Sequence, residues 1–450
     1  MSRFLARLIP VVAIAVLTAC SNSTTQSSAL PYAYAPNAAA SDHVAIPSFL
    51  VGHHFYHACP PVGPGFSRCF AILSDAVGPD STGPGCPAHT PGCYGPSDLQ
   101  AAYGITAAAK TGGKGVTVAI VDAHGYPTAA KDLAAYRKYY GLPACGTGCL
   151  TIVNQSGKTS PLPSADAGWD GEQALDLDMV SATCPNCKIL LVQSDDASNV
   201  NLYTAVATAS KMAHVVSNSW GGGESAATYP IFDSHKGVVI LASAGDSGAG
   251  APAYGGYPAS PSQEPCGFAG TICVGGTSLT MSAGKRVGEV VWDGLSGMYM
   301  CGASGATPCA TGSGCSALVK KPTFETDHGC TKRSSADISA NADPYTGVAV
   351  SCTPCGGFLS GDGGTSESSP LIAGMYGLAG NAATQPGDAS VIWKTGATKP
   401  TAFHDITSGH NDLKGVTGLV CSKTIFYICN AGKGYDGPTG WGTPNGLTAL

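Results

Sequence analysis

The stretch SGDGGTSESSP at residues 360–370 runs directly into the apolar run LIAGMYGLAG at residues 371–380. Small polar residues followed by a long apolar run predict a turn that opens a buried helix. A serine at such a junction lies where backbone N–H groups point outward and the helix dipole favours negative charge. Gly363 and Gly364 would let another backbone, such as that of a peptide substrate, approach closely. The stretch therefore suits a nucleophile, although an ordinary helix cap explains the same pattern equally well.

Upstream of this stretch, apolar segments alternate with segments of helical pattern. We expect strands at 116–123, 188–193, 214–219 and 237–245, and helices at 96–103, 128–140, 170–182, 199–213 and about 223–235. Such alternation predicts an α/β fold with a parallel sheet and helices on both faces. In these sheets functional residues gather where strands end, which points to Asp122, Ser219, Trp220 and Asp246. Residues 295–332 are rich in Gly and Cys and predict a loop insertion.

The first twenty residues predict export. Arg3 and Arg7 precede an apolar run that ends in LTAC at 17–20, which is a signal-peptide pattern and not a membrane span. The ending resembles a bacterial lipobox, which implies cleavage before Cys20 and lipidation of its thiol. The alternative is an ordinary signal peptide with a chance cysteine. We therefore expect a protein that is extracellular or held at the cell envelope by lipid, with residues 21–95 forming a tether and a Cys-rich lead-in.

The remaining eighteen cysteines fall into couples that are close in sequence. The couples are 59/69, 86/93, 145/149, 184/187, 266/273, 301/309, 315/330, 352/355 and 421/429. In an exported chain these spacings predict short-loop disulfides, although sequence alone does not fix the connectivity. A zinc site or a redox pair is the alternative for 184/187 and 352/355.

Composition limits the partners. A net charge of −6 with only 23 Lys and Arg argues against nucleic acid, and 44% hydrophobic residues support a large core. No second run of 18 apolar residues follows the signal peptide, so the only membrane contact we expect is the lipid on Cys20. Protein or peptide substrates remain as the expected partners, with a monomer as the default state.

The acidic segment WDGEQALDLD at 169–178 offers a base for a serine nucleophile. On a helix, Glu172 and Asp176 share one face and Asp178 points away. Two carboxyls buried together share a proton, and one of the pair could accept the proton of Ser366. The alternative is a solvated acidic helix face. None of the eleven histidines has a recognisable catalytic setting.

A third carboxyl stands at the end of an expected strand, in LASAGDSG at 241–248. A protonated Asp246 can donate a hydrogen bond to developing negative charge, which is the task of an oxyanion site. An ordinary Asx-turn explains the same residue.

The order of ExxLD, SNSWG, SAGDSG and GGTSESSP along an alternating β/α chain closely resembles the sedolisins, the serine-carboxyl peptidases. The likeness covers residues 96–450 and implies a subtilisin-like three-layer fold with a mostly parallel central sheet and disulfide-rich loops. It also implies Ser366 as nucleophile, Glu172 as general base, Asp176 as its orienting partner and Asp246 as the oxyanion aspartate.

The resemblance assigns supporting roles to Asp122 and Trp220, and it implies one calcium ion. The ligands it implies are the side chains of Asp405 and Asp436 and the carbonyl groups of Ile406, Gly432 and Gly434. Carboxylates and carbonyls are the hard oxygen donors that Ca²⁺ prefers. One departure from the family pattern is Glu367, which places another carboxyl after Ser366.

These patterns together predict an exported serine-carboxyl endopeptidase that acts at acid pH. A subtilisin-like enzyme with a histidine base would need a Gly-His-Gly-Thr-His segment after the first strand, and the sequence has none. The alternative from another class is a catalytically silent, lipid-anchored protein that binds peptides or glycans on a peptidase scaffold. Retention of all four catalytic positions argues against it.

Overall fold

The computed structural model describes residues 47–77, 83, 86–225, 229–250, 262–293, 309–412 and 426–450. The predicted signal peptide with Cys20, and the tether at 21–40, lie outside these ranges. Within them, no helix combines the length and the apolar character needed to cross a membrane.

The centre of the fold is an eight-stranded sheet with the order β13-β12-β9-β7-β4-β6-β5, in which β16 also pairs with β12. Its strands are β4 (Thr117–Ala123), β5 (Leu150–Asn154), β6 (Lys188–Ser194), β7 (Val215–Asn218), β9 (Val239–Ser243), β12 (Ile272–Ser282), β13 (Lys285–Val291) and β16 (Ile338–Asn341). All neighbours run parallel except β13, which pairs antiparallel with β12. The mostly parallel sheet expected from the sequence is confirmed.

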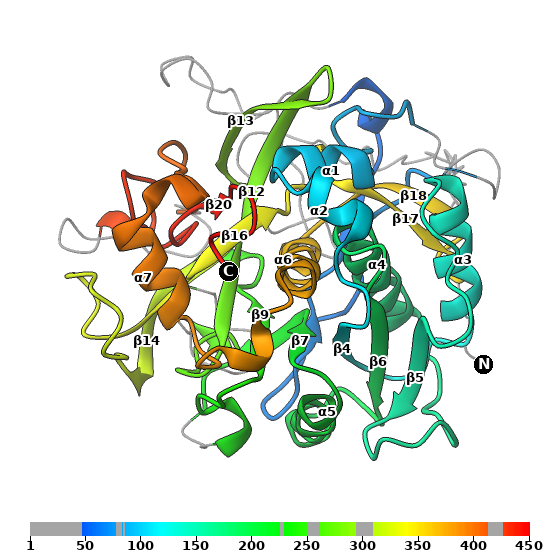
Figure 1. Cartoon of the computed structure of the whole chain (residues 1–450), viewed down its shortest axis with the longest axis horizontal. Coiled ribbons are helices and arrows are strands. Elements are labelled where there is room, and N and C mark those ends of the chain that lie inside the picture. The colour runs from blue at the N-terminus through cyan, green and yellow to red at the C-terminus, as the bar shows by residue number, and fades with distance from the viewer. Residues whose placement is uncertain are drawn as a thin grey trace, which may run out of the picture. The chain divides into compact units, whose positions relative to one another are not determined.

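Side chains of β4 alternate between two cores, which gives the fold its three layers. Val118 and Ile120 pack with α4 (Ala167–Thr183) and α6 (Thr365–Ala379), whereas the neighbouring Ala119 and Val121 pack with α5 (Asn199–Met212). Strand side chains point alternately to opposite faces, so a continuous apolar strand needs cover on both. Figure 1 shows α4 and α6 side by side, with α5 on the other side of the strands.

Smaller elements surround these layers. The other helices are α1 (Pro96–Ala102), α2 (Thr106–Thr111), α3 (Ala129–Tyr139) and α7 (Ser390–Thr398). The strands outside the central sheet are β1 (Phe55–His57), β2 (Arg68–Cys69), β3 (Ile72–Ser74), β8 (Trp220–Gly223), β10 (Ser247–Ala249), β11 (Gln263–Glu264), β14 (Ala310–Lys320), β15 (Lys332–Ser335), β17 (Val348–Cys352), β18 (Gly357–Asp362), β19 (Phe403–His404) and β20 (Thr443–Pro444). The β17–β18 hairpin leads into α6.

Two expectations about local structure are wrong. The helix expected at about 223–235 is instead the end of β8 followed by a 3₁₀ turn at Pro230–Phe232, with 226–228 outside the described residues. The glycines of β8 favour extended pairing with β11 over a helix. The loop expected at 295–332 contains β14, where Gly312 lets the strand pass close to the backbone of Ala244.

Seven of the expected disulfides are present. They are 59–69, 86–93, 145–149, 184–187, 266–273, 315–330 and 352–355. The expected pairs 301/309 and 421/429 each include a cysteine outside the described residues. Cys184–Cys187 and Cys352–Cys355 are bonded pairs, so neither couple forms the alternative zinc site.

Candidate active site

The start of α6 directs the hydroxyl of Ser366 toward Glu172 on α4. Gly364 precedes the helix at φ 88°, a conformation that suits glycine, and a side chain there would collide with the carbonyl oxygen of Phe70. Pro370 has no N–H, so it cannot bond the Ser366 carbonyl four residues back. The hydroxyl of Ser219 lies 3.5 Å from that carbonyl instead. Ser366 is fully buried.

The Ser366 hydroxyl donates a hydrogen bond to one carboxylate oxygen of Glu172. Ser366 Oγ lies 2.9 Å from Glu172 Oε2 and 3.0 Å from the carbonyl oxygen of Ser219. The same Glu172 Oε2 accepts a hydrogen bond from the backbone N–H of Ala71 at 2.7 Å. Glu172 Oε1 has no hydrogen-bond partner among the described residues. Glu172 Oε2 is therefore placed to accept the proton of the Ser366 hydroxyl, and the Ala71 N–H holds the same oxygen by a hydrogen bond.

Asp176 lies one helical turn further along α4, on the face that carries Glu172. Its Oδ1 accepts a hydrogen bond from Ser219 Oγ at 2.7 Å, and its Oδ2 has no partner in the part of the chain that is described. Asp178 points elsewhere, as expected, and accepts a hydrogen bond from the backbone N–H of Ser351 at 2.9 Å.

Asp246 reaches the other side of Ser366 from the turn after β9. Its Oδ1 accepts hydrogen bonds from the N–H and the hydroxyl of Thr365, both at 2.8 Å. Its Oδ2 lies beside Gly364 and 3.8 Å from His57 Nδ1. Because Thr365 occupies only one oxygen, the second remains available to hold a proton and donate it in a hydrogen bond.

Asp122 and Trp220, the two residues with predicted supporting roles, are buried next to this cluster of carboxyls. Asp122 is the buried penultimate residue of β4, and neither of its oxygens has a hydrogen-bond partner within the described residues. Trp220 is fully buried, and its indole N–H donates to the carbonyl of Val121 at 2.7 Å. The structure thus brings together all six residues that the sequence indicated around the catalytic position.

Burial dominates the electrostatics of the four carboxyls. It raises the pKa of Glu172 and Asp176 well above their usual values, and the charge of Asp122 raises both further. Burial also raises the pKa of Asp122 to about 8 and that of Asp246 to about 7, the latter opposed by the hydrogen bonds from Thr365. Desolvation penalises the charged form of a carboxyl, so the group holds protons into the neutral range.

Sequence reasoning missed the contributions of residues 57–71. Ala71 acts through a backbone N–H, for which a sequence carries no signal. His57 is 8% exposed at its side chain beside Asp246, and Arg68 Nη2 lies 3.2 Å from its Nε2. The lead-in has no periodic pattern, so nothing in the sequence places it against helices that follow a hundred residues or more later.

The predicted calcium ligands also gather in one loop region. Asp405 accepts hydrogen bonds from the N–H of Gly434 at 3.1 Å, and Asp436 accepts one from the N–H of Gly432 at 3.0 Å. No described residue donates a hydrogen bond to the carbonyl of Ile406, Gly432 or Gly434. Within the described residues no group of three or more His, Cys, Asp and Glu side chains forms a metal site. Two carboxylates and three free carbonyls nevertheless fit the oxygen-rich set that calcium takes.

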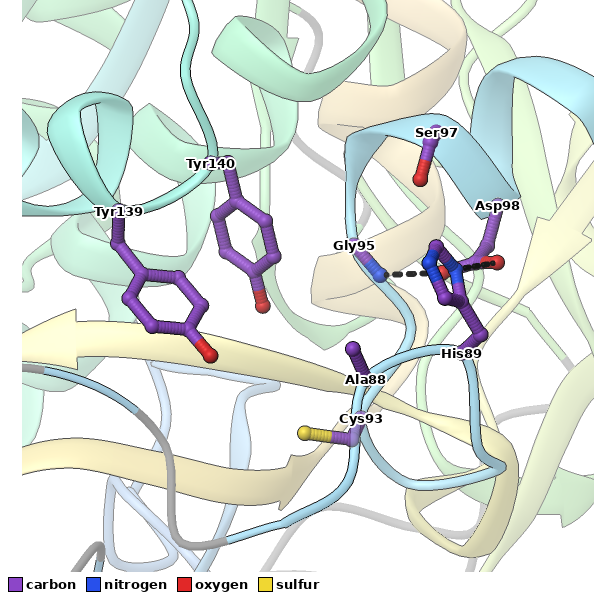
Figure 2. A pocket seen from close by; sticks show the side chains of 8 residues that line it. All are labelled: Ala88, His89, Cys93, Gly95, Ser97, Asp98, Tyr139 and Tyr140. Carbon is purple, nitrogen blue, oxygen red and sulfur yellow. Dashed lines mark hydrogen bonds and ion pairs between the residues drawn. The ribbon is translucent and has the colours of Figure 1, made fainter.

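A surface pocket of about 280 Å³ lies elsewhere and offers different chemistry. Figure 2 shows Tyr139 and Tyr140 on one side of it and the His89–Asp98 pair on the other. Asp98 Oδ1 lies 2.8 Å from His89 Nδ1, and Asp98 Oδ2 accepts from the N–H of Gly95 at 3.1 Å. Asp98 Oδ2 caps α1 and Asp98 Oδ1 contacts the His89 ring, so both oxygens of this carboxylate are already engaged.

Comparison with known proteins agrees with this geometry. The model of the subtilase family matches residues 146–395. Kumamolisin of Bacillus sp. (strain MN-32) is 28% identical over 80% of this chain, and sedolisin of Pseudomonas sp. (strain 101) is 26% identical over 78% of it. The chain spans 63% and 59% of the length of these two relatives. A solved Pseudomonas sedolisin (serine-carboxyl proteinase), complexed with two molecules of pseudo-iodotyrostatin, matches at a TM-score of 0.66 and 26% identity, covering 78% of this chain and 95% of that one.

The chain belongs to the subtilase family, whose model covers more than half of it. Within that family its likeness is to the sedolisins, in sequence and in structure. The resemblance and the subtilisin-like α/β fold expected from the sequence are both confirmed.

The raised pKa values predict a protein that is more stable in acid. The folded chain binds more protons than the unfolded chain between about pH 4 and pH 8, so the free energy of unfolding falls as pH rises through that window. Asp122→Asn removes one of these protons and should reduce the slope by up to about 1.4 kcal/mol per pH unit. Chemical unfolding at several pH values, in a Ser366→Ala background that excludes any reaction at that serine, measures both slopes. Stability that rises with pH would contradict this electrostatic picture.

Proposed function

We propose that this protein is an exported serine-carboxyl endopeptidase that hydrolyses peptide bonds at acid pH. The observation that carries the proposal is the contact of Ser366 Oγ with Glu172 Oε2 at 2.9 Å inside a fully buried group of carboxyls. A hydroxyl becomes a nucleophile when an adjacent base takes its proton, and here the group within reach is a carboxylate. The relatives that share the fold support the class of reaction.

In the proposed reaction, Ser366 Oγ attacks the substrate carbonyl carbon while Glu172 accepts its proton. Glu172 then returns that proton to the leaving amine, and water hydrolyses the resulting ester by the same route. Asp246, protonated on Oδ2, donates a hydrogen bond to the oxyanion. Its position beside Gly364 supports this role because the missing side chain leaves room for the substrate carbonyl.

Asp176 and Asp122 would act through Glu172. Glu172 Oε1 and Asp176 Oδ2, on successive turns of α4, are both without hydrogen-bond partners among the described residues, so one shared proton between them would satisfy both. Ser219 Oγ fixes Asp176 from the other side. The pKa of Asp122 is also raised, so Asp122 would hold a second proton near Glu172 and Asp176.

The compartment and the cofactor belong to the same proposal. Seven disulfides with short loops fit an oxidising environment outside the cytoplasm, and the lipobox-like segment supports lipidation of Cys20. One calcium ion, held by Asp405 and Asp436 with the carbonyls of Ile406, Gly432 and Gly434, would neutralise two carboxylates and stabilise the loops. Substrates are proteins or peptides, and the protein acts as a monomer.

Ser366→Ala tests the proposed reaction. It removes the nucleophile and should lower kcat/KM for a denatured protein such as casein at pH 4 by at least about 10³-fold, because base and oxyanion site then have nothing to activate. Ser368→Ala is the matched control, since Ser368 lies on the same buried turn but donates to the carbonyl of Thr365. Equal activity of Ser366→Ala and Ser368→Ala would refute the proposal.

Calcium removal tests the metal site. Chelation should lower Tm by several degrees, since a ligand that binds only the folded state stabilises it, and added Ca²⁺ should restore the loss. Asp405→Asn should abolish the response to chelator. Asp412→Asn, another aspartate of the same region, should keep it. A Tm that chelator leaves unchanged in the parent protein would rule out the ion.

A further inference from the structure

Glu367 directly follows the proposed nucleophile, and its side chain turns into the protein interior. It is the third residue of α6 and is fully buried. Its Oε1 accepts a hydrogen bond from Asn341 Nδ2 at 2.8 Å, and its Oε2 has no hydrogen-bond partner among the described residues. Figure 1 shows β16, which ends at Asn341, beside α6. The carboxyl that departs from the sedolisin pattern therefore joins the start of α6 to the end of β16.

Asn341 is a fixed partner for this carboxyl. Its Oδ1 accepts hydrogen bonds from the N–H of Leu279 and from Thr346 Oγ1, both at 2.9 Å. Its Nδ2 also donates to the carbonyl of Thr346 at 2.7 Å, and its backbone N–H donates to the hydroxyl of Tyr103 at 2.7 Å. Both hydrogens and the oxygen of the amide are thus engaged. Rotation of the amide would break several of these bonds at once, so Glu367 is held by a donor that keeps one orientation.

The residue after Asn341 supports the turn that precedes the nucleophile. The carbonyl of Ala342 accepts a hydrogen bond from the N–H of Gly364 at 2.7 Å. A Cβ added to Gly363 would lie 2.5 Å from the same carbonyl oxygen, so the two backbones pass close to each other. Gly364 also lies beside Asp246 Oδ2. A shift of α6 relative to β16 would therefore change the separation between the proposed nucleophile and the proposed oxyanion donor.

The surroundings of Glu367 favour its protonated form. Burial raises the pKa of Glu367 well above its usual value, although the hydrogen bond from Asn341 lowers it. Three neighbouring carboxyls raise the pKa further by charge repulsion, namely Asp343, Asp362 and Glu289. A protonated carboxyl keeps a carbonyl oxygen that can accept the bond from Asn341. Glutamine has the same length and the same acceptor, so it reproduces this contact without an ionisable group.

Building on the proposed function, we propose that Glu367 is a positioning residue, which holds the first turn of α6 against Asn341 and so sets the place of Ser366 Oγ in the site. Glu367 contacts none of the reacting atoms and acts through Ser366, its neighbour in the chain. Reacting groups keep a productive geometry only when the residues that support them are held by packing and hydrogen bonds. A displacement of about 1 Å can lower the rate of the chemical step by about 10²-fold.

The test measures kcat and KM for a peptide substrate at pH 4, at a temperature well below the Tm of each variant. Glu367→Leu keeps much of the buried volume but offers no acceptor to Asn341, so kcat should fall at least about 10-fold while KM stays within about twofold. Glu367→Gln restores the acceptor and should bring kcat to within about threefold of the parent value. If Glu367→Leu does not fold, Glu367→Asp takes its place, since a side chain one methylene shorter should lose the contact and show the same fall.

Thermal unfolding of the same samples separates positioning from stability. A Tm that falls in Glu367→Leu while kcat stays at the parent value would make Glu367 a purely structural residue and overturn the proposal. An equal loss of kcat in Glu367→Leu and Glu367→Gln would also overturn it, because the acceptor would then not matter. A rise in KM with unchanged kcat would assign Glu367 to substrate binding instead.

The parent protein serves as the control for the proposed function. If it hydrolyses neither the peptide nor casein, the peptidase proposal fails and the positioning role fails with it. If the parent is active and all variants share its kcat, only the positioning role is wrong.

Discussion

Burial of four carboxyl groups around one serine is the constraint on which the rest of this structure depends. Asp122, Glu172, Asp176 and Asp246 are at most 1% exposed, and among the described residues each has at least one oxygen without a hydrogen-bond partner. A buried carboxylate without compensation is costly, so burial raises the pKa of each of these groups and the cluster shares protons at a higher pH than exposed carboxyls would. Acid therefore favours the folded site, and the proposed reaction requires a protonated Asp246 together with a Glu172 that can still accept a proton.

The fold places these groups at the edge where parallel strands end. Asp122 is near the end of β4 and Asp246 follows β9, while α4 and α6 pack against each other and bring Glu172 to Ser366. Ser219, between β7 and β8, contacts both Asp176 and Ser366. The extended segment at 66–74 closes the site from outside and supplies a backbone N–H to Glu172. Scaffold and lead-in therefore form one hydrogen-bonded unit.

The sequence predicts most of this arrangement because its signals are local or periodic. The apolar strand at 116–123 and the alternating helices determine the sheet, and the spacing of Glu172 and Asp176 places both on one helix face. What the sequence does not reveal depends on the backbone or on distant pairing. The N–H of Ala71 has no side-chain signal, and the position of His57 beside Asp246 follows from β1 pairing with β3. The helix expected at 223–235 was wrong because strand pairing with β11 outweighed local pattern.

The most direct test of carboxyl chemistry is the pH dependence of kcat/KM for a peptide substrate, compared between the parent protein and Asp246→Asn. Asp246 must be protonated to donate, and its pKa is raised to about 7, so the parent should lose activity as pH rises through about 7. Asparagine donates at every pH, so Asp246→Asn should lose that decline. Activity that instead rises through pH 7 to a plateau would indicate an imidazole base and contradict the account.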